Sequence, residues 1–331
     1  MREMPESQRS SRVWWWFAGI ILIAAIALNF ADLLRIARLP VLAGMIAPRN
    51  AITAITVFGG ILGAALMAIR RVRFIVVPIV VALLVSAGIS AAIVMARGLV
   101  NAEPAIARPD QLRIFSWNTN GALVTPDAIA SAAAAVHANV VVLPDISSGD
   151  ERRILDAFTA HQIPMQPRSV PASGAKVLVL ISSSLDRSDA VSVGTGMKSR
   201  SLVVRPNDST LPTFVAIHAE KPLLSGSASW DADLTWVADI CRSDNVIAIG
   251  DFNATLDGFG GDRLGSCRDA ATSVDAGSVG TWPTSVPVWL AMPIDHVLVT
   301  PQWMVDSFTV LTDHDASGAR HRPILAVVSR R

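Results

Sequence analysis

The stretch Val246-Ile247-Ala248-Ile249-Gly250-Asp251-Phe252-Asn253 runs from apolar residues into a glycine and then into polar side chains. The apolar part predicts a strand near Val246–Ile249 that is buried on both faces. Asp251 and Asn253 lie two residues apart, so an extended backbone places both on one side. A carboxylate beside an amide can orient a water and bind a phosphoryl oxygen, and strand ends commonly carry catalytic groups. Taken alone, the motif is equally compatible with an Asx turn that has no function.

Short β-rich runs separated by Pro, Gly, Asp and Asn continue this pattern over the rear two thirds of the chain. Further strands are expected near Leu112–Trp117, Val140–Leu143, Lys176–Ile181, Thr213–Ile217, Asp295–Val299 and Ile324–Val328. Helices are expected near Pro126–Val136, Asp150–Ala160 and Ser229–Ile240. Strands that are apolar throughout imply sheets covered on both faces, which predicts one domain of α/β or α+β layers.

Polar clusters stand at five other predicted strand ends. They are Ser116–Asn120, Leu143–Asp145, Ile217–Pro222, Ile294–Leu298 and His321–Pro323. A single Asp or Asn in such a place is more often a turn residue, and a single His is more often a structural hydrogen-bonding group. Because all of the clusters occur at strand ends, we expect them to form one site.

These residues together make the sequence similar to the endonuclease/exonuclease/phosphatase superfamily, which includes pancreatic deoxyribonuclease, apurinic endonucleases, inositol-polyphosphate phosphatases and neutral sphingomyelinases. The resemblance covers roughly residues 110–329 and is carried most specifically by Gly250–Asn253 with Ile294–His296, supported by Gly280–Pro283. It is particularly a resemblance to bacterial members anchored by a few N-terminal spans. It implies a four-layer α/β sandwich, two packed mixed sheets flanked by helices, with the site at one end of the sheets.

The resemblance also implies a Mg²⁺-dependent attack of water on a phosphodiester or phosphomonoester, with Mn²⁺ as a possible substitute. Carried over to this sequence, Asn118 and Asp145 hold the metal, and Asp251 positions or deprotonates the attacking water. Such a site needs few protein carboxylates, because Mg²⁺ prefers oxygen ligands and keeps several of its waters.

The remaining roles follow from the same resemblance. Asn253 and His218 donate hydrogen bonds to the phosphate, and Asp295 orients His321. The Asp295–His321 pair then exchanges protons with water or with the leaving group. Imidazole donors beside a metal stabilise the charge that develops on phosphoryl oxygens.

The sequence departs from the family pattern at two positions. Asp145 stands where the family usually has Glu, and Arg320 precedes His321 where the family usually has Asp. The Arg320 cation either repels the metal or binds the substrate phosphate bidentately, together with Asn120. His314, in the dipeptide Asp313-His314, is an alternative to His321 as the catalytic histidine.

Charge-free apolar runs fill the front of the chain at about residues 13–31, 51–69 and 74–96. Each is long enough for a helix that crosses a bilayer, which predicts a membrane anchor of three transmembrane helices over residues 13–97. A cleaved signal peptide is the alternative for the first run, but no convincing cleavage site follows it. The anchor is preceded by a cytoplasmic segment 1–12 and followed by a linker 98–109 and a domain 110–331.

Arginines predict the orientation of this anchor. With the N-terminus inside, six arginines lie on the cytoplasmic side, against Arg35, Arg38 and Arg49 on the other. This distribution favours a cytoplasmic N-terminus and an extracytoplasmic rear domain in a multi-pass membrane protein. The cysteines, Cys241 and Cys267, agree, because a disulfide between them suits an oxidising compartment. Two unpaired thiols are the alternative.

The predicted function is a membrane-anchored, extracytoplasmic phosphoesterase. Residues 1–97 carry a net charge of +7, and the rear domain carries −6. An acidic domain disfavours long nucleic acid, whose affinity comes mainly from neutralised phosphates, and favours a lipid head group or another small phosphate ester. The alternatives are a catalytically degenerate domain of the same fold that acts as a binding or scaffold module, and an extracellular nuclease. The sequence does not indicate an oligomeric state.

Overall fold

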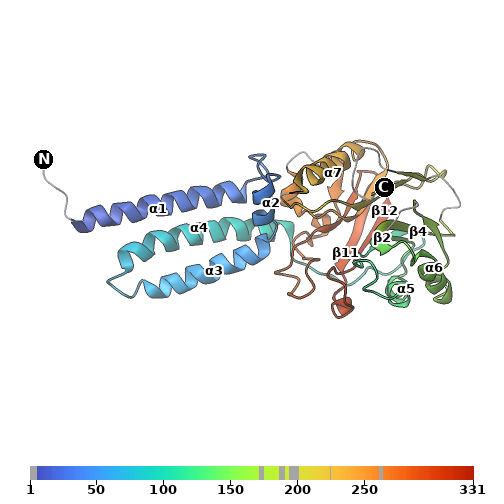
Figure 1. Cartoon of the computed structure of the whole chain (residues 1–331), viewed down its shortest axis with the longest axis horizontal. Helices are drawn as coiled ribbons and strands as arrows, with labels where there is room; N and C mark the ends of the chain where they lie inside the picture. Colours follow the sequence, from blue (N-terminus) through green and yellow to red (C-terminus); the bar gives the residue numbers. More distant parts are fainter. Residues whose placement is uncertain (1–5, 171–174, 186–190, 194–200, 224, 261–263) are drawn as a thin grey trace.

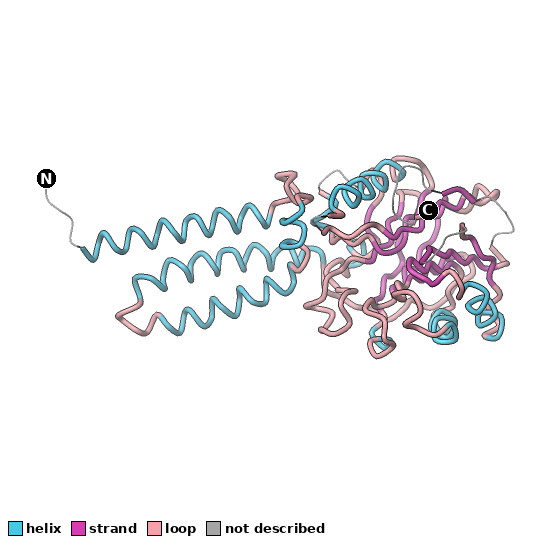
Figure 2. The backbone as a smooth tube through the Cα atoms, viewed as in Figure 1, coloured by secondary structure: helices cyan, strands magenta, loops and turns pink. Residues whose placement is uncertain are grey.

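The computed structural model describes residues 6–170, 175–185, 191–193, 201–223, 225–260 and 264–331. Figure 1 shows long helices that project side by side from one end of a body made of sheets and shorter helices. The first helix begins at the far end of these helices, and the C-terminus lies in the body. The tube in Figure 2 shows that the strands are confined to this body.

The first sheet is mixed and has the strand order β11-β12-β1-β2-β4-β3. β1 runs parallel to β2 and antiparallel to β12. Side chains alternate along β1, so Ile114 faces the other sheet and Phe115 faces the outer helices. The bounds are β1 Gln111–Ser116, β2 Val140–Ser147, β3 Met165–Arg168, β4 Ala175–Ser182, β11 Trp303–Val310 and β12 Ile324–Arg330.

The second sheet is also mixed and has the order β5-β6-β7-β8-β10-β9. Here β7 and β8 are parallel, and β10 is antiparallel to β8. The bounds are β5 Val191–Val193, β6 Leu202–Val204, β7 Thr213–His218, β8 Val246–Asp251, β9 Arg268–Asp269 and β10 Asp295–Val299. The two sheets therefore repeat one local plan, a parallel pair followed by an antiparallel neighbour.

The two sheets pack face to face over a core of small and branched apolar side chains, including Ile114 and Val142 from one sheet and Ile249 from the other. α5 (Pro126–Ala135) and α6 (Glu151–Ala160) cover the outer face of the first sheet, and α7 (Ser227–Ile240) covers that of the second. Thr125 caps α5 by accepting from the backbone N–H of Ala128. The predicted α/β sandwich of two packed mixed sheets flanked by helices is confirmed.

The front of the chain forms α1 (Glu6–Asn29), α2 (Pro40–Ile46), α3 (Arg49–Leu66) and α4 (Arg73–Arg97). Among the described residues, α3 and α4 are long and apolar enough to cross a membrane. The prediction of three such helices is wrong on this measure. The first apolar helix covers only Val13–Asn29, and the chain leaves it at Asn29, before the end of the apolar run in the sequence.

Two arginines of these helices bind the same carboxylate of the body. Arg49, at the start of α3, and Arg97, at the end of α4, each donate two hydrogen bonds to Asp257, at 2.7 to 3.0 Å. Asp257 belongs to the short helix α8 (Leu256–Phe259), which follows directly after the Asp251–Asn253 motif. The helices that carry Arg49 and Arg97 are therefore joined to the segment that carries the candidate site.

The predicted linker 98–109 also contacts the body. Gly277 donates from its backbone to the carbonyl of Arg97, and Ser278 donates to that of Gly98. The Asn101 side chain pairs with both backbone groups of Val310 on β11. The start of this segment is therefore held against the body by hydrogen bonds.

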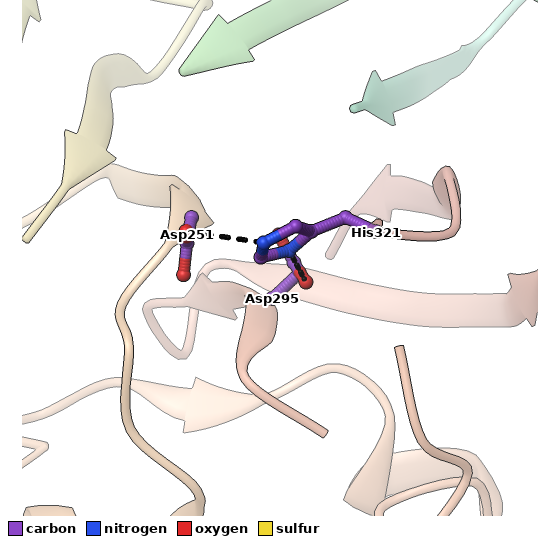
Figure 3. A group of neighbouring side chains, drawn as sticks. All are labelled: Asp251, Asp295 and His321. Atoms are coloured by element: carbon purple, nitrogen blue, oxygen red, sulfur yellow. Dashed lines mark hydrogen bonds and ion pairs between the residues drawn. The ribbon is translucent and has the colours of Figure 1, made fainter. Parts of the chain in front are cut away.

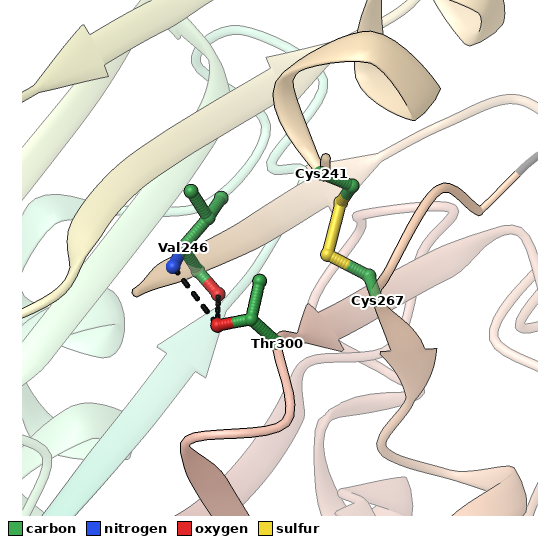
Figure 4. Close-up of a disulfide and its surroundings, with 4 residues drawn as sticks. All are labelled: Cys241, Val246, Cys267 and Thr300. Carbon is green, nitrogen blue, oxygen red and sulfur yellow. Dashed lines mark hydrogen bonds between the residues drawn. A yellow bond between two sulfur atoms is a disulfide. The ribbon is translucent and has the colours of Figure 1, made fainter. Parts of the chain in front are cut away.

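A disulfide joins Cys241, directly after α7, to Cys267, just before β9 (Figure 4). Nearby, Thr300 holds the start of β8 by bonding both backbone groups of Val246. The predicted disulfide is therefore present, and it closes the loop around β8. The remaining short elements are the 3₁₀ turns η1 (Thr272–Val274) and η2 (Thr312–His314).

Candidate functional site

The candidate site lies where strand ends of both sheets meet. Because β1 is parallel to β2 and β7 is parallel to β8, each parallel pair ends at one edge of its sheet. β10 and β12 run the other way and therefore begin at the same edge. Asn118 follows β1, Asp251 ends β8, Asp295 begins β10 and His321 precedes β12. The topology thus gathers residues that are up to 203 positions apart in the chain.

The centre of the site is an imidazole between two carboxylates (Figure 3). His321 Nδ1 lies 2.9 Å from Asp295 Oδ2, and His321 Nε2 lies 3.9 Å from Asp251 Oδ2. The three residues are 5%, 3% and 1% exposed, respectively. Because Asp295 binds Nδ1, the ring is oriented with Nε2 toward Asp251, and Nε2 is the atom that can exchange a proton.

The charges of this group favour an imidazolium. Burial alone lowers the pKa of His321, but the carboxylates of Asp295 and Asp251 outweigh burial and raise this pKa to about 9. Burial raises the pKa of Asp251, while the charge of His321 lowers it. We place the proton on His321, which has a carboxylate on either side.

Asp251 is the centre of a tight turn. Its Oδ1 accepts from the backbone N–H of Asn253, which adopts φ 47°, and its Oδ2 accepts from Asn118 Nδ2 at 2.9 Å. Asn253 Nδ2 donates to the carbonyl of Ala219 at 2.9 Å. The motif therefore is an Asx turn, and the turn also fixes the carboxylate that faces His321.

Gly250 explains why a glycine precedes this carboxylate. Its φ is 136°, a conformation that other residues rarely adopt, and an added Cβ would lie 2.1 Å from the carbonyl oxygen of Ile217. Any side chain here would separate β7 from β8 at their ends. The close approach sets the site end of β8 against that of β7.

β7 places His218 at this edge. His218 is the register partner of Asp251, and the backbone N–H of Ala219 donates to the carbonyl of Asp251 at 2.9 Å. The His218 side chain is half-buried, and its charge lowers the pKa of Asp251. His218 thus lies beside Asp251 on the side opposite to β10.

The predicted metal ligands come from the first sheet. Asn118 is buried, and its Oδ1 accepts from the backbone N–H of Asn120 at 2.9 Å. Asp145 lies at a bulge near the end of β2, and its carbonyl accepts from Thr119 and from Gly121. The ends of β1 and β2 are therefore tied together, with the half-buried Asp145 next to the turn that follows Asn118.

Arg320 and Asn120, the predicted phosphate contacts, lie beside each other. The backbone N–H of Arg320 donates to Asn120 Oδ1 at 3.2 Å, and the Arg320 side chain is exposed. The buried His321 next to it keeps its bond to Asp295. Arg320 therefore stands at the surface edge of the site, outside the buried group.

The other histidines have different surroundings. The His314 ring packs on Trp117, with centroids 5.2 Å apart, and burial lowers its pKa. His296 is buried between Asp269 and the carbonyl of Ala254. Of the two candidates for the catalytic histidine, the one bonded to Asp295 is His321.

Thr281 and Trp117 support the site, and sequence reasoning assigned a role to neither. Thr281 Oγ1 donates to Asp295 Oδ2 at 2.6 Å and accepts from the backbone N–H groups of Ile294 and Asp295. Trp117 Nε1 donates to the carbonyl of His321 at 2.9 Å. Both residues lie in quoted motifs, Ser116–Asn120 and Gly280–Pro283, but their partners are distant in sequence.

The described donors suit a divalent cation. Ligand atoms of Asp251, Asp295 and His321 all lie within 4.8 Å of one another. The Asn118 oxygen fits such an ion better than His321, whose Nδ1 is engaged with Asp295. Asn118 Oδ1 accepts one hydrogen bond and retains a second lone pair. Oxygen donors of this kind are typical of Mg²⁺ and Mn²⁺ sites.

Comparison with known proteins gives one consistent result. The sequence matches the model of the Endonuclease/Exonuclease/phosphatase family over residues 115–323. No curated protein matches the chain. Similar solved structures include an endonuclease/exonuclease/phosphatase from Beutenbergia cavernae, at 18% identity and a TM-score of 0.51, over 67% of this chain and 72% of that one.

Two further structures share the fold. A family protein from Bacteroides thetaiotaomicron is 12% identical with a TM-score of 0.52, over 68% of this chain and 100% of that one. A humanized TDP2 from D. rerio is 14% identical with a TM-score of 0.54, over 66% of this chain and 99% of that one. At these identities the likeness establishes the fold of the body alone.

Proposed function

The chain belongs to the endonuclease/exonuclease/phosphatase family, and on that basis we propose that it is a membrane-anchored, extracytoplasmic phosphoesterase that uses Mg²⁺ or Mn²⁺. Members of this family are divalent-metal-dependent hydrolases that act on phosphate esters. The observation that carries the proposal is the buried Asp295–His321 pair facing Asp251 at the common edge of the two sheets.

Each residue of the site has a part in the proposed reaction. Asp251 orients the attacking water and accepts its proton, while Asn253 and His218 donate hydrogen bonds to the phosphate. His321, held by Asp295, exchanges a proton with the water or the leaving group through Nε2. Asn118 and Asp145 would hold the metal, which when bound neutralises charge on the phosphoryl oxygens.

The contacts of the site give less support to the alternative, a catalytically degenerate domain that only binds. The departure at Arg320 leaves the Asp295–His321 hydrogen bond in place, and the Arg320 side chain is exposed at the edge of the site. In that position its guanidinium is available to a substrate phosphate. A scaffold module has no need of an imidazolium buried between two carboxylates, because such a group is costly to keep.

The membrane placement is supported by the surfaces of the helices. Large apolar side chains are exposed along α1, α3 and α4, among them Trp16, Ile55 and Phe58. A water-soluble protein rarely exposes so large an apolar area, whereas a bilayer accommodates it. The substrate that fits a tethered, acidic domain is a lipid head group or another small phosphate ester rather than long nucleic acid.

The test is hydrolysis by the full chain reconstituted in lipid vesicles. Parallel assays use bis-p-nitrophenyl phosphate, phospholipid vesicles and duplex DNA, each with Mg²⁺, with Mn²⁺ or with a chelator. We expect chelator-sensitive hydrolysis of the ester and the lipid, and little of the DNA. Preferential, salt-sensitive DNA cleavage would support the nuclease alternative, and no hydrolysis of any substrate would support the binding module.

A further inference from the structure

The helices of the anchor enclose a groove. α4 packs along both α1 and α3, while α1 and α3 make little contact with each other in the described chain. The space between them has a volume of about 370 Å³. Its walls are almost entirely apolar, with Ile21, Ala25 and Leu28 on α1, Ile52 on α3 and Leu83 on α4. Figure 1 shows the three helices side by side.

The charged group of the groove lies toward the body, and its polar wall residues besides Asn29 are Thr56, Ser86 and Ser90, of which Thr56 donates to the carbonyl of Ile52 and Ser90 pairs with Thr53. Toward the body the groove ends at Met45 and Ile46 of α2 and at the buried side chains of Asn29 and Arg49. Arg49 Nη1 donates to Asn29 Oδ1 at 2.7 Å, and the same guanidinium is bonded to Asp257 of the body. The groove is therefore amphipathic along its length, with an apolar run that leads to a fixed cationic end.

The end of the groove is close to the candidate site. Ile46, which closes the groove, also lines a small cavity on the body side of α2. That cavity is bounded by Asn253 of the site turn and by Pro222 and Trp230. A molecule that lies in the groove therefore has its polar end beside the segment that follows Asp251.

We propose that this groove binds an acyl chain of a bilayer phospholipid, with the head group at the Asn29–Arg49 end. The inference rests on the membrane placement proposed above. Water is a poor occupant, because it needs several polar partners that the walls lack. At membrane depth the surrounding solvent is itself acyl chains, and an apolar groove open to it is filled by them. Arg49 and Arg97 share the single carboxylate of Asp257, so this end keeps a net positive charge that matches a lipid phosphate.

The test maps the contacts of a lipid by photo-crosslinking. The full chain carrying Asp251→Ala is reconstituted in phosphatidylglycerol vesicles that contain a tracer phosphatidylcholine with a diazirine on its acyl chain. After irradiation, labelled peptides are identified by mass spectrometry. Ala25→Phe fills the groove, whereas Ala65→Phe adds the same bulk on an exposed position of α3 that does not line it.

We expect concentrated labelling of residues 21–28 and 45–56 in the parent and in Ala65→Phe, and a several-fold loss of it in Ala25→Phe. Labels spread evenly over outward faces and insensitive to Ala25→Phe would overturn the groove but retain the membrane placement. Links between two copies of the chain in place of lipid labels would assign the groove to a partner helix and overturn the inference. Because Asp251→Ala removes the proposed hydrolysis, occupancy is read independently of activity.

Discussion

His321 is the residue on which the proposed chemistry turns. It is buried, bonded through Nδ1 to Asp295, and directed through Nε2 at Asp251. His314 lacks this pair of carboxylates and stacks on Trp117 instead. The two histidines are therefore distinguished by their environments, although the sequence makes both candidates.

Replacing each histidine by asparagine separates them. We expect His321→Asn to lower metal-dependent turnover by about 10²–10⁴-fold, the range for loss of a general acid–base group. His314→Asn should retain turnover within a few-fold, because it removes only a contact with Trp117. Initial rates on bis-p-nitrophenyl phosphate measure both. Equal losses in the two variants would contradict the assignment.

The site residues at strand ends are largely predictable from the sequence, whereas the residues that hydrogen-bond to them and position them are not. A polar side chain at the end of a buried strand stands out in the sequence, as Asp251, Asn118 and His218 do. Thr281 carries no such signal, because a threonine between a glycine and a tryptophan in a loop is ordinary. Its importance comes from the 2.6 Å bond to Asp295, and only the packing of the loop before β10 creates it.

At the scale of elements, α8 connects the N-terminal helices to the site. Arg49 and Arg97 each bind Asp257 with two hydrogen bonds, and Asp257 lies six residues after Asp251. We expect Asp257→Asn to lower the stability of the full chain by about 3 kcal/mol, because it leaves two guanidinium groups without a buried anion. Thermal unfolding followed by tryptophan fluorescence in detergent measures the loss. Asp239→Asn, which breaks the exposed pair with Arg242, should cost less than about 1 kcal/mol, and equal costs would contradict the account.

The same carboxylate predicts a dependence on pH. Burial raises the pKa of Asp257, but the hydrogen bonds and charges of Arg97 and Arg49 outweigh burial and lower it from 3.8 to about 2. A lowered pKa stabilises the folded state above the unfolded value, here by about 2 kcal/mol, and this contribution is lost as the pH falls from about 4 to about 2. The stability difference between the parent and Asp257→Asn should therefore shrink over this interval. A constant difference would contradict the shift.

The disulfide is a second feature that stabilises an element of the fold. It closes a segment of 26 residues that includes β8. We expect the double variant Cys241→Ala, Cys267→Ala to lose about 3 kcal/mol of stability, since the unfolded chain regains the freedom of that loop. Urea unfolding of the parent with and without a reductant is the control. The reduced parent should match the variant, and a variant as stable as the oxidised parent would contradict this role.

The sequence predicts the elements that periodicity and length reveal and misses the others. Long apolar or alternating runs predicted β8, β10 and α7 to within a few residues. β3, β5, β6 and β9 are short, and their pairing partners rather than their own patterns determine them. β11 was also missed although it has eight residues, and a bulge between Val305 and Ser307 interrupts its alternation. α2 was missed because a helix of seven residues needs the packing of its neighbours to form.

At the scale of the whole molecule, the long helices extend away from the body that carries the candidate site. α1 begins at the end away from the body, and the turn from Arg70 to Arg73 joins α3 to α4 (Figure 1). At the body end, Arg38 and Arg49 are bonded to Asp231 and Asp257, so their presence there has a structural reason. In the described part of the chain, the arginines from Arg70 to Arg73 make no ion pair with the body, which favours their interpretation as cytoplasmic signals.

Epitope tags at the C-terminus and in the turn between α3 and α4 test this orientation. In intact spheroplasts, an external protease should remove the C-terminal tag and spare the tag in the turn, because two crossings by α3 and α4 place the body outside and the turn inside. Lysed cells, in which both tags are cleaved, are the control. Cleavage of the turn tag alone would reverse the orientation, and release of the chain without detergent would contradict the anchor.

The most direct test of the account is metal-dependent hydrolysis with Asp251 removed. Asp251→Ala is compared with Asp156→Ala, which removes an exposed carboxylate of α6, in the full chain with Mg²⁺ or Mn²⁺ and bis-p-nitrophenyl phosphate. The account predicts chelator-sensitive hydrolysis by the parent and by Asp156→Ala, and a loss of it in Asp251→Ala. Undiminished hydrolysis by Asp251→Ala would contradict the placement of the active site at this edge of the sheets.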